Sequence, residues 1–547
     1  MIKLASTRRA FVKAGSAAAL AIAAGSRRGW TQAPDVSSWA QLPEAGQREL
    51  AMRAIDAARA AGADYADVRF SHVTYLSLGT SNIGMEPPSQ TERISYGIRS
   101  LVSGVWGFVA GQDYAPESVA RLARTSVLQA KANSTGTRRT LQLAPVPPVP
   151  DGKWDMAVRI DPFKIAMDDQ LNLMTLAIEA TSKVKATASM RIVCGFDWQR
   201  EERIFASTDG SFIVQTLFRG MPYDGGAHVT VQARDDVFNY ASSSVQDLDA
   251  AGKGYEMVLE ADLVNTLPQA AEEALRMLSS KPVQVGRYDL VVHARAMASP
   301  LSDTLGRALE YDRAAGLEAN AQGTSFIAPP QDVLGKMRAG SQLLTVKGDR
   351  SQPGSLAAVG WDDEGVKPRE FTLVKDGVVV DYHTTREMAM KLDWWYKQQG
   401  RETRSHGCCG AGSADRIPMQ HMPNLSMQPG AGDLSFEDII ADTKNGIAIS
   451  GGSAGSIDQQ LLNGQYGATA VQEIRNGKLA GYLRGLNYQF RAPEFWKSMD
   501  AIGGKRSYVL CGSSSRKGQP LQSSVQSIGT VPARFRQVNV INVGRAR

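Results

Sequence analysis

The hydrophobic positions at the start of the chain change between helical and strand spacing. Residues 50–62 have apolar side chains one helical turn apart, and residues 64–70 alternate as a strand does. Two apolar strands follow over residues 96–110, and a second helical pattern covers residues 118–132. This order of helix, strand, hairpin and helix predicts an α+β domain, which we assign to residues 34–150.

A proline-rich stretch, APVPPVP at residues 144–150, predicts a stiff, extended connector. After it, helical patterns at residues 163–180 and 263–278 enclose a run of strand patterns over residues 186–233. We therefore expect a middle domain of helices and sheet over residues 151–286.

From residue 287 onward, short strands and glycine-rich turns dominate. Asp376-Gly377 and Asn476-Gly477 each separate two strand-like halves, and both dipeptides favour two-residue hairpin turns. Repeated hairpins of this type indicate a closed or nearly closed β-barrel. The sequence therefore predicts a β-barrel-like domain over residues 287–547, and an α+β fold class for the whole chain.

The N-terminus has the features of an export signal. Residues 7–13, TRRAFVK, fit a twin-arginine motif, and a weakly apolar run follows at residues 14–25. That run is too short to cross a bilayer, so we expect no stable membrane anchor. Residues 1–33 are predicted to be a twin-arginine signal peptide, and the mature protein to be periplasmic or otherwise exported.

The signal segment also explains the charge of the chain. The formal net charge is +6, and residues 1–33 contain six lysines and arginines and no acidic residue. The mature chain is thus close to neutral and lacks the basic composition of a nucleic-acid-binding protein. No nucleic-acid partner is expected.

The unit at residues 288–326 carries the candidate chemistry. A strand pattern at 288–293 leads into a helical pattern with Leu301, Leu305 and Leu309 on one face. This unit resembles the active-site segment of the TldD/PmbA metallopeptidase family, in which a helix bearing HExxxH precedes GLEGD and a GTS-aromatic motif. The shared positions are Leu301, Gly306, Leu309, Glu310, Asp312 and Gly323-Thr324-Ser325-Phe326.

The resemblance extends in order from about residue 51 to about residue 531. Further motifs similar to those of the family are Trp361-Asp362-Asp363-Glu364-Gly365, Lys375-Asp376-Gly377, Arg416-Ile417-Pro418-Met419, Gln428-Pro429-Gly430, Glu473-Ile474-Arg475-Asn476-Gly477-Lys478 and Leu510-Cys511-Gly512. Family membership implies a peptidase-like fold and a role connected with peptide hydrolysis.

The resemblance also implies a zinc site, but the ligand positions have changed. The family's His, Glu and His correspond here to Ser302, Asp303 and Arg307, and its C-terminal cysteine ligand corresponds to Cys511. Serine is a poor zinc ligand and arginine is a permanent cation. None of the histidines is followed by Glu, so no displaced motif exists. We expect no metal or other cofactor; zinc is the expected cofactor if this interpretation is wrong.

Several roles remain open for the substituted residues. Arg307 has three alternatives: a pair with Asp303 on the same helix face, a pair with an ionised Cys511, or exposure to solvent. Asp303, at the position of the family Glu, is the candidate catalytic residue. Cys511 is a nucleophile if a base such as His293 lies near it, and otherwise a ligand or a remnant structural thiol. A second metal site is conceivable at residues 406–409 with His421.

The sequence leads to one main functional hypothesis and two alternatives. The family pairs TldD-like and TldE-like (PmbA) subunits, of which only the first carries the metal motif, and cleaves unfolded or extended peptides in an internal cavity. We therefore expect a metal-free, non-catalytic subunit in a homo- or heterodimer with a TldD-like or TldE-like homologue. The alternatives are an active peptidase using Asp303 and Cys511, and a stand-alone peptide-binding module.

The export signal gives a first prediction. Because recognition depends on the paired guanidinium groups, replacing Arg8 and Arg9 together by Lys should leave the protein in the cytoplasm. Fractionation followed by immunoblotting measures the location of the protein. The control is Lys3→Arg, which exchanges one basic side chain for another outside the arginine pair. Periplasmic accumulation of the double variant would refute the predicted twin-arginine signal.

Overall fold

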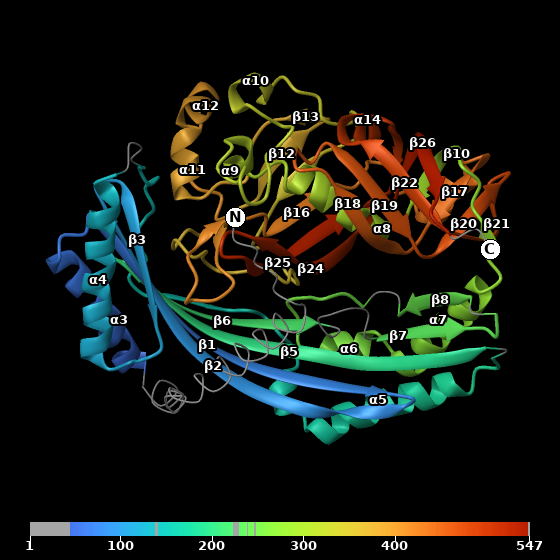
Figure 1. Ribbon diagram of the computed structural model, residues 1–547, viewed down its shortest axis with the longest axis horizontal. Helices are drawn as coiled ribbons and strands as arrows, with labels where there is room; N and C mark the ends of the chain where they lie inside the picture. The colour runs from blue at the N-terminus through green and yellow to red at the C-terminus, as the bar shows by residue number, and fades with distance from the viewer. Residues whose placement is uncertain are drawn as a thin grey trace, which may run out of the picture.

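The computed structural model describes residues 44–136, 141–186, 188–221, 229–237, 239–245 and 248–544. The predicted signal peptide at residues 1–33 lies outside these ranges. Two layers make up the described chain: a long curved sheet with helices on its outer side, and the C-terminal half above its inner side (Figure 1). Within the described ranges, none of the helices combines the length and the apolar character that a membrane crossing requires.

The first sheet contains eight strands in the order β3-β2-β1-β5-β6-β4, with β7 paired to β5 and β8 paired to β7. Their bounds are β1 Tyr65–Ser81, β2 Gly84–Val102, β3 Val105–Gly111, β4 Gly152–Asp155, β5 Ser189–Ser207, β6 Phe212–Met221, β7 Val229–Arg234 and β8 Tyr240–Ser244. Strands from both sides of residue 150 thus share one sheet. The sheet is therefore continuous across residue 150, and the division into domains there stays a prediction.

The outer side of this sheet is covered by two groups of helices. Helices α3 (Glu44–Ala60) and α4 (Pro116–Ser134) pack at one end, and α5 (Met167–Ser182) and α7 (Leu263–Met277) pack at the other (Figure 1). The four predicted helices are confirmed. A 3₁₀ turn, η1, spans Pro162–Lys164, and a short helix, α6, spans Glu256–Glu260.

The C-terminal half is built on two further sheets and a two-stranded ribbon. The larger sheet has the order β18-β19-β22-β26-β10-β17-β20-β21-β9, with β23 beside β26; the other has the order β13-β12-β11-β16-β25-β24; and β14 pairs with β15. The strand bounds are β9 Lys281–Pro282, β10 Gly286–Val292, β11 Val346–Gly348, β12 Phe371–Lys375, β13 Val378–Val379, β14 Cys409–Gly410, β15 Met419–Gln420, β16 Asn424–Met427, β17 Asn445–Ile449, β18 Gly452–Ile457, β19 Asn463–Ala468, β20 Val471–Arg475, β21 Lys478–Arg484, β22 Leu486–Arg491, β23 Met499–Ile502, β24 Val509–Lys517, β25 Gln522–Thr530 and β26 Ala533–Asn542.

Short helices connect and cover these sheets. Their bounds are α8 Ala294–Leu301, η2 Ser302–Gly306, α9 Tyr311–Ala314, α10 Pro330–Val333, α11 Arg386–Lys391, α12 Asp393–Gln398, α13 Phe436–Ala441, α14 Ala492–Lys497 and η3 Lys505–Ser507.

The α+β class is confirmed, whereas the closed barrel is not formed. Both predicted hairpins are present, with positive φ at Asp376, Gly377, Asn476 and Gly477 as such tight turns require. In the described chain, however, the larger sheet ends at β18 and β9, and these two strands do not pair. Local hairpins specify neighbouring strands but not whether the two ends of a sheet meet, which is why the prediction of closure failed.

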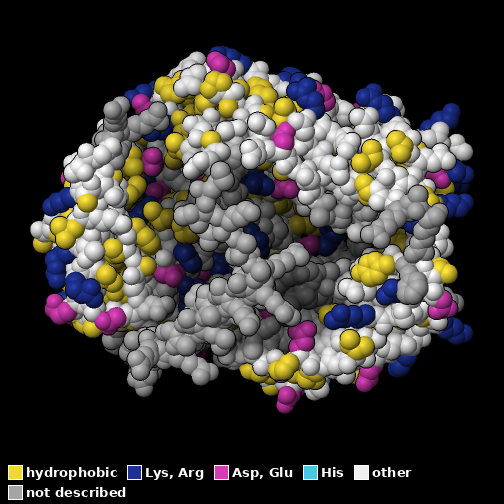
Figure 2. Space-filling model, in the orientation of Figure 1, with side chains coloured by type: hydrophobic (Ala, Val, Ile, Leu, Met, Phe, Trp, Pro, Cys, Tyr) yellow, Lys and Arg dark blue, Asp and Glu magenta, His cyan; other side chains and the backbone are white. Residues whose placement is uncertain are grey.

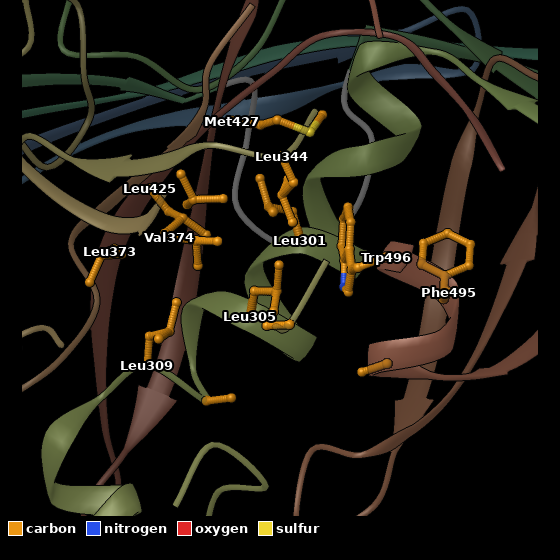
Figure 3. Packing of buried hydrophobic residues seen from close by; sticks show 14 of the residues in the cluster. Leu301, Leu305, Leu309, Leu344, Leu373, Val374, Leu425, Met427, Phe495 and Trp496 are labelled. Carbon is orange, nitrogen blue, oxygen red and sulfur yellow. The ribbon is translucent and has the colours of Figure 1, made fainter. Parts of the chain in front are cut away.

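The largest apolar core encloses the helix that follows β10. Leu301, Leu305 and Leu309 are all fully buried and point into a cluster with Trp496 and Leu344 (Figure 3). Burying a leucine side chain stabilises a fold by about 1.5–3 kcal/mol, so this face holds the helix firmly in the C-terminal half.

Buried ion pairs join the first sheet to the C-terminal half. Asp363 accepts from Arg69 of β1 at 2.8 Å and from Arg203 of β5 at 2.7 Å. Arg99 of β2 lies 3.6 Å from Glu364. These side chains are nearly inaccessible to solvent, where a charge is tolerated only with a partner. Burial opposes ionisation, yet the two guanidinium groups lower the pKa of Asp363 to about 2.

Asp363→Asn should therefore destabilise the protein strongly. Removing one partner of a buried pair costs about 3–5 kcal/mol, which urea unfolding of the wild type and the variant would measure. Asp151→Asn is the matched control, because the Arg48–Asp151 pair is 40 % and 66 % exposed and such pairs contribute about 1 kcal/mol or less.

The same carboxylate predicts a pH dependence. Its folded pKa of about 2 lies below the ordinary value near 4, so its stabilisation is present above about pH 4 and is lost as the pH falls toward 2. The difference in unfolding free energy between wild type and Asp363→Asn should shrink over that interval. A constant difference would contradict the assignment.

Candidate functional site

The predicted strand and helix of residues 288–326 are present, with one irregular turn. Strand β10 leads into α8, whose first turn is capped by His293; its side chain accepts from the N–H of Arg295 at 3.4 Å. The helix then widens into the π turn η2, where the N–H of Arg307 donates to the carbonyl of Ser302 at 2.8 Å. Such turns are frequent at functional sites. The candidate residues Ser302, Asp303 and Arg307 all lie in or beside it.

Ser302 is enclosed in a polar network within the protein. Its side chain is buried, and its Oγ accepts from Nε2 of Gln526 at 3.2 Å. The same amide donates to Oγ of Ser513 on β24 at 3.0 Å. The hydroxyl is therefore bonded to β25, which pairs with β24, the strand that carries Cys511.

Asp303 and Arg307 pair with each other, which is one of the three alternatives for Arg307. Oδ1 of Asp303 lies 3.5 Å from Nη1 of Arg307, and Oδ2 accepts from the hydroxyl of Tyr466 at 3.2 Å. Tyr466 is fixed by stacking on Phe490, with ring centroids 5.8 Å apart. Burial raises the pKa of Asp303, and Arg307 and Tyr466 oppose that shift. The guanidinium thus lies beside the carboxylate at the two positions that the sequence resemblance assigns to the family's metal-binding motif.

Cys511 lies on β24 and is buried against a different set of charges. Burial raises the pKa of its thiol well above the usual range, and a hydrogen bond to Asp249 adds to the shift. Asp249 in turn pairs with Arg295 of α8 at 2.7 Å. The backbone of Ala250 is bridged to Gly512, so closely that a Cβ at Gly512 would lie 2.0 Å from the carbonyl oxygen of Ala250. The thiol is therefore protonated and bonded to a carboxylate.

A buried charge cluster, which sequence reasoning missed, follows the π turn. Lys517 of β24 lies 3.1 Å from Glu310 and 2.7 Å from Asp312, and Arg313 lies 2.6 Å from Glu310. Burial opposes ionisation of Glu310, but Lys517 and Arg313 lower its pKa to about 2. Glu310 and Asp312 were recognised as frame positions, whereas no local signal connects Lys517, some two hundred residues later, to them.

The loop at residues 406–409 does not form a second metal centre. His406 stacks on Phe371 at 3.9 Å and lies 3.1 Å from Asp381, while Cys408 lies 3.6 Å from His383. These side chains have separate partners. Within the described ranges, no three or more His, Cys, Asp or Glu side chains are grouped as a metal ion requires.

The side chains at the family's zinc positions do not fit zinc. The Ser302 hydroxyl is bound by Gln526, the position of the second histidine holds a guanidinium, and the Cys511 thiol is bonded to Asp249. Zinc sites need at least three protein ligands from neutral imidazole, thiolate or carboxylate groups. No reaction step through a metal is therefore assigned to these residues.

Known proteins share sequence and fold with this chain. Residues 285–542 match the model of the PmbA/TldA metallopeptidase C-terminal domain. A metalloprotease of Methanocaldococcus jannaschii is 25 % identical over 448 residues, covering 80 % of this chain and 89 % of the relative. The chain belongs to the TldD/PmbA family. A TldD homologue of Buchnera aphidicola is 25 % identical over 43 % of this TldD/PmbA chain and 44 % of its own.

Solved structures show that the TldD/PmbA fold extends over most of the chain. TldE of Thermococcus kodakarensis superposes with a TM-score of 0.64 at 16 % identity, covering 90 % of this chain and 100 % of the other. A Thermotoga maritima protein described as a candidate modulator of a DNA gyrase gives a TM-score of 0.67 at 15 % identity with the same coverage. At this level of identity the similarity establishes the fold alone.

Lys517→Met should destabilise this TldD/PmbA protein by about 3–5 kcal/mol, because it leaves two buried carboxylates without their shared cation. Urea unfolding measures the loss, and Lys347→Met is the control, since Lys347 pairs with the 56 % exposed Glu370. Adding Asp312→Asn should recover part of the loss by removing one uncompensated charge. Equal effects of Lys517→Met and Lys347→Met would refute the role of the cluster.

Proposed function

We propose that this chain is a metal-free, non-catalytic TldD/PmbA subunit. It pairs with a homologous subunit that bears the metal motif, and together they enclose unfolded or extended peptides for hydrolysis by the partner. The observation that carries the proposal is the Asp303–Arg307 pair with its Tyr466 hydrogen bond, which places an internal cation where the family has a metal ligand. The export signal adds that the subunit works in the periplasm.

The two principal residues of the active-peptidase alternative are poorly prepared for catalysis. A thiol must ionise to act as a nucleophile, and Cys511 has its pKa raised by burial and by Asp249. Burial raises the pKa of Asp303, but Oδ2 already accepts from Tyr466 and Oδ1 faces Arg307, so both oxygens have protein partners in place of a water. Both arrangements support a structural role for these side chains.

Zinc content tests the metal-free part of the proposal. The chain, separated from any partner, should contain well under one zinc per molecule by elemental analysis, and chelators should leave its melting temperature unchanged. Restoring the motif with Ser302→His, Asp303→Glu and Arg307→His should raise the zinc content, because the helix frame is retained. The same triple variant with Cys511→Ser is the control for the fourth ligand. Stoichiometric zinc in the wild type, lost on Cys511→Ser, would refute the proposal.

Co-purification tests the pairing. A tagged chain recovered from its natural host should bring a TldD/PmbA homologue with an intact HExxxH motif in equal amount, across an interface above about 2,000 Å² as in obligate pairs. Light scattering and mass spectrometry identify the assembly. A chain that is monomeric at micromolar concentration and recovers no homologue is instead the stand-alone peptide-binding module.

A further inference from the structure

Buried guanidinium and carboxyl groups meet at the inner face of the first sheet. Glu201 and Asp363 both have a lowered pKa and stay ionised, because burial is outweighed by neighbouring arginines. A third carboxyl, Asp362, has its pKa raised to about 7 by burial and by Glu364, so it supplies only part of a charge. Four arginines face this group, and each residue is less than 10 % exposed: Arg69, Arg203, Arg219 and Arg350.

Most of these arginines have their donors occupied. Arg203 pairs with both Glu201 and Asp363, and Arg69 adds two backbone carbonyls to its pair with Asp363. Arg350 donates to three backbone carbonyls. These contacts occupy most donors of the three guanidinium groups, although Nε of Arg69 is buried without a partner.

Arg219 has the fewest hydrogen bonds in this set. Among the described residues its side chain makes a single hydrogen bond, from Nη1 to Oε2 of Glu201 at 3.2 Å, and its Nε is buried without any partner. Glu201 is shared, since it accepts from Arg203 at 3.0 Å and from Ser71 at 2.8 Å. Burial lowers the pKa of Arg219, and the positive charges of Arg203 and Arg350 add to that effect although Glu201 opposes it.

Arg219 lies beside a partly exposed part of this face. Tyr75 of β1, Gln199 of β5 and Arg219 of β6 form one row across the sheet, on the face turned toward the C-terminal half. Tyr75 is 38 % exposed, whereas Arg69 in the same strand is buried under the C-terminal half. The face therefore becomes accessible along this row. Figure 2 shows the molecule hollowed between its two layers, with Lys, Arg, Asp and Glu side chains inside.

The same row adjoins the family's active-site strand. Gly220, the residue after Arg219, is bridged to Ala251, and the neighbouring Ala250 is bridged to Gly512, the residue after Cys511. An extended chain that lies along β24 inside the hollow would therefore come close to Arg219.

We propose that Arg219 anchors a subsite for a carboxylate group of an extended peptide in the hollow. A guanidinium with free donors binds a carboxylate with charge-assisted hydrogen bonds, and the ligand would supply Arg219 with partners that the protein does not. The carboxylate belongs either to the peptide C-terminus or to an acidic side chain. This inference rests on the proposed peptide-enclosing function and adds a substrate class to it.

Peptide binding tests the subsite. Fluorescence anisotropy is measured on the full chain, or on its complex where a partner co-purifies, with labelled Gly-Ser-Ala peptides in three forms: free acid, C-terminal amide, and amide with one internal Glu. The free acid, the Glu-containing amide, or both should bind about tenfold more tightly than the plain amide. Which of the two gains affinity identifies the source of the carboxylate.

Arg219→Gln should abolish that preference and leave the affinity for the plain amide unchanged. Arg200→Gln is the matched control, because Arg200 lies on the same sheet with its side chain on the opposite face and 34 % exposed. It should retain the preference. If Arg219→Gln does not fold, wild-type protein is tested with acetate and chloride at equal ionic strength, where acetate should displace the acidic peptide more strongly.

The outcomes separate the subsite from the proposed function. Equal binding of all three peptides to the wild type, a preference retained in Arg219→Gln, or equal displacement by acetate and chloride would overturn the subsite and leave peptide enclosure intact. Failure of every peptide to bind either the chain or its complex would overturn both.

Discussion

The carboxylate of Asp363 is the interaction on which the arrangement of the two layers depends. It accepts from arginines on two strands of the first sheet and from the N–H of Ala411, while it is itself carried by a loop of the C-terminal half. These groups are buried, so each layer depends on the other for its ion-pair partners. If the layers separated, the charged groups would lose those partners and would have to be solvated by water instead. The layers also contact each other at the far end of the sheet, where Tyr482 donates to Glu273.

The family's active-site frame is kept by packing, independently of its metal chemistry. Leu301, Leu305 and Leu309 bury the helix in the largest core, and the π turn still directs the next side chains toward β24 and β25. Within that frame, the Arg307 guanidinium and the Lys517 ammonium lie beside the carboxylates of Asp303 and Glu310. Fixed cations that pair with inward-facing carboxylates allow such a frame to persist without a bound metal ion, which supports the proposed non-catalytic role.

The buried arginines on the inner face of the first sheet have unequal numbers of partners, and under the proposed subsite this inequality gives the face a preference among peptides. Arg203 and Arg69 each bond to several carboxylate or carbonyl oxygens, whereas Arg219 is left with one shared partner. A wall that carries a spare buried cation favours ligands with a carboxylate over neutral ones of the same shape. Under the proposed function, a non-catalytic subunit would in this way still influence which chains the assembly retains.

The sequence by itself determined the local features: the helices on the first sheet, the hairpin turns at Asp376-Gly377 and Asn476-Gly477, the strand and helix of residues 288–301, and the loss of histidine at the metal positions. Each depends on side chains close together in the chain, where periodicity and turn chemistry act directly. The Asp303–Arg307 pair was also foreseeable, as one of three alternatives, because the two residues are one helical turn apart. Only the tertiary structure decided that the larger sheet stays open, that strands on both sides of residue 150 join one sheet, and that Lys517 meets Glu310 and Asp312. It alone placed Asp249 against Cys511 and left Arg219 short of partners. These outcomes depend on contacts between residues tens to hundreds of positions apart, which no local pattern encodes.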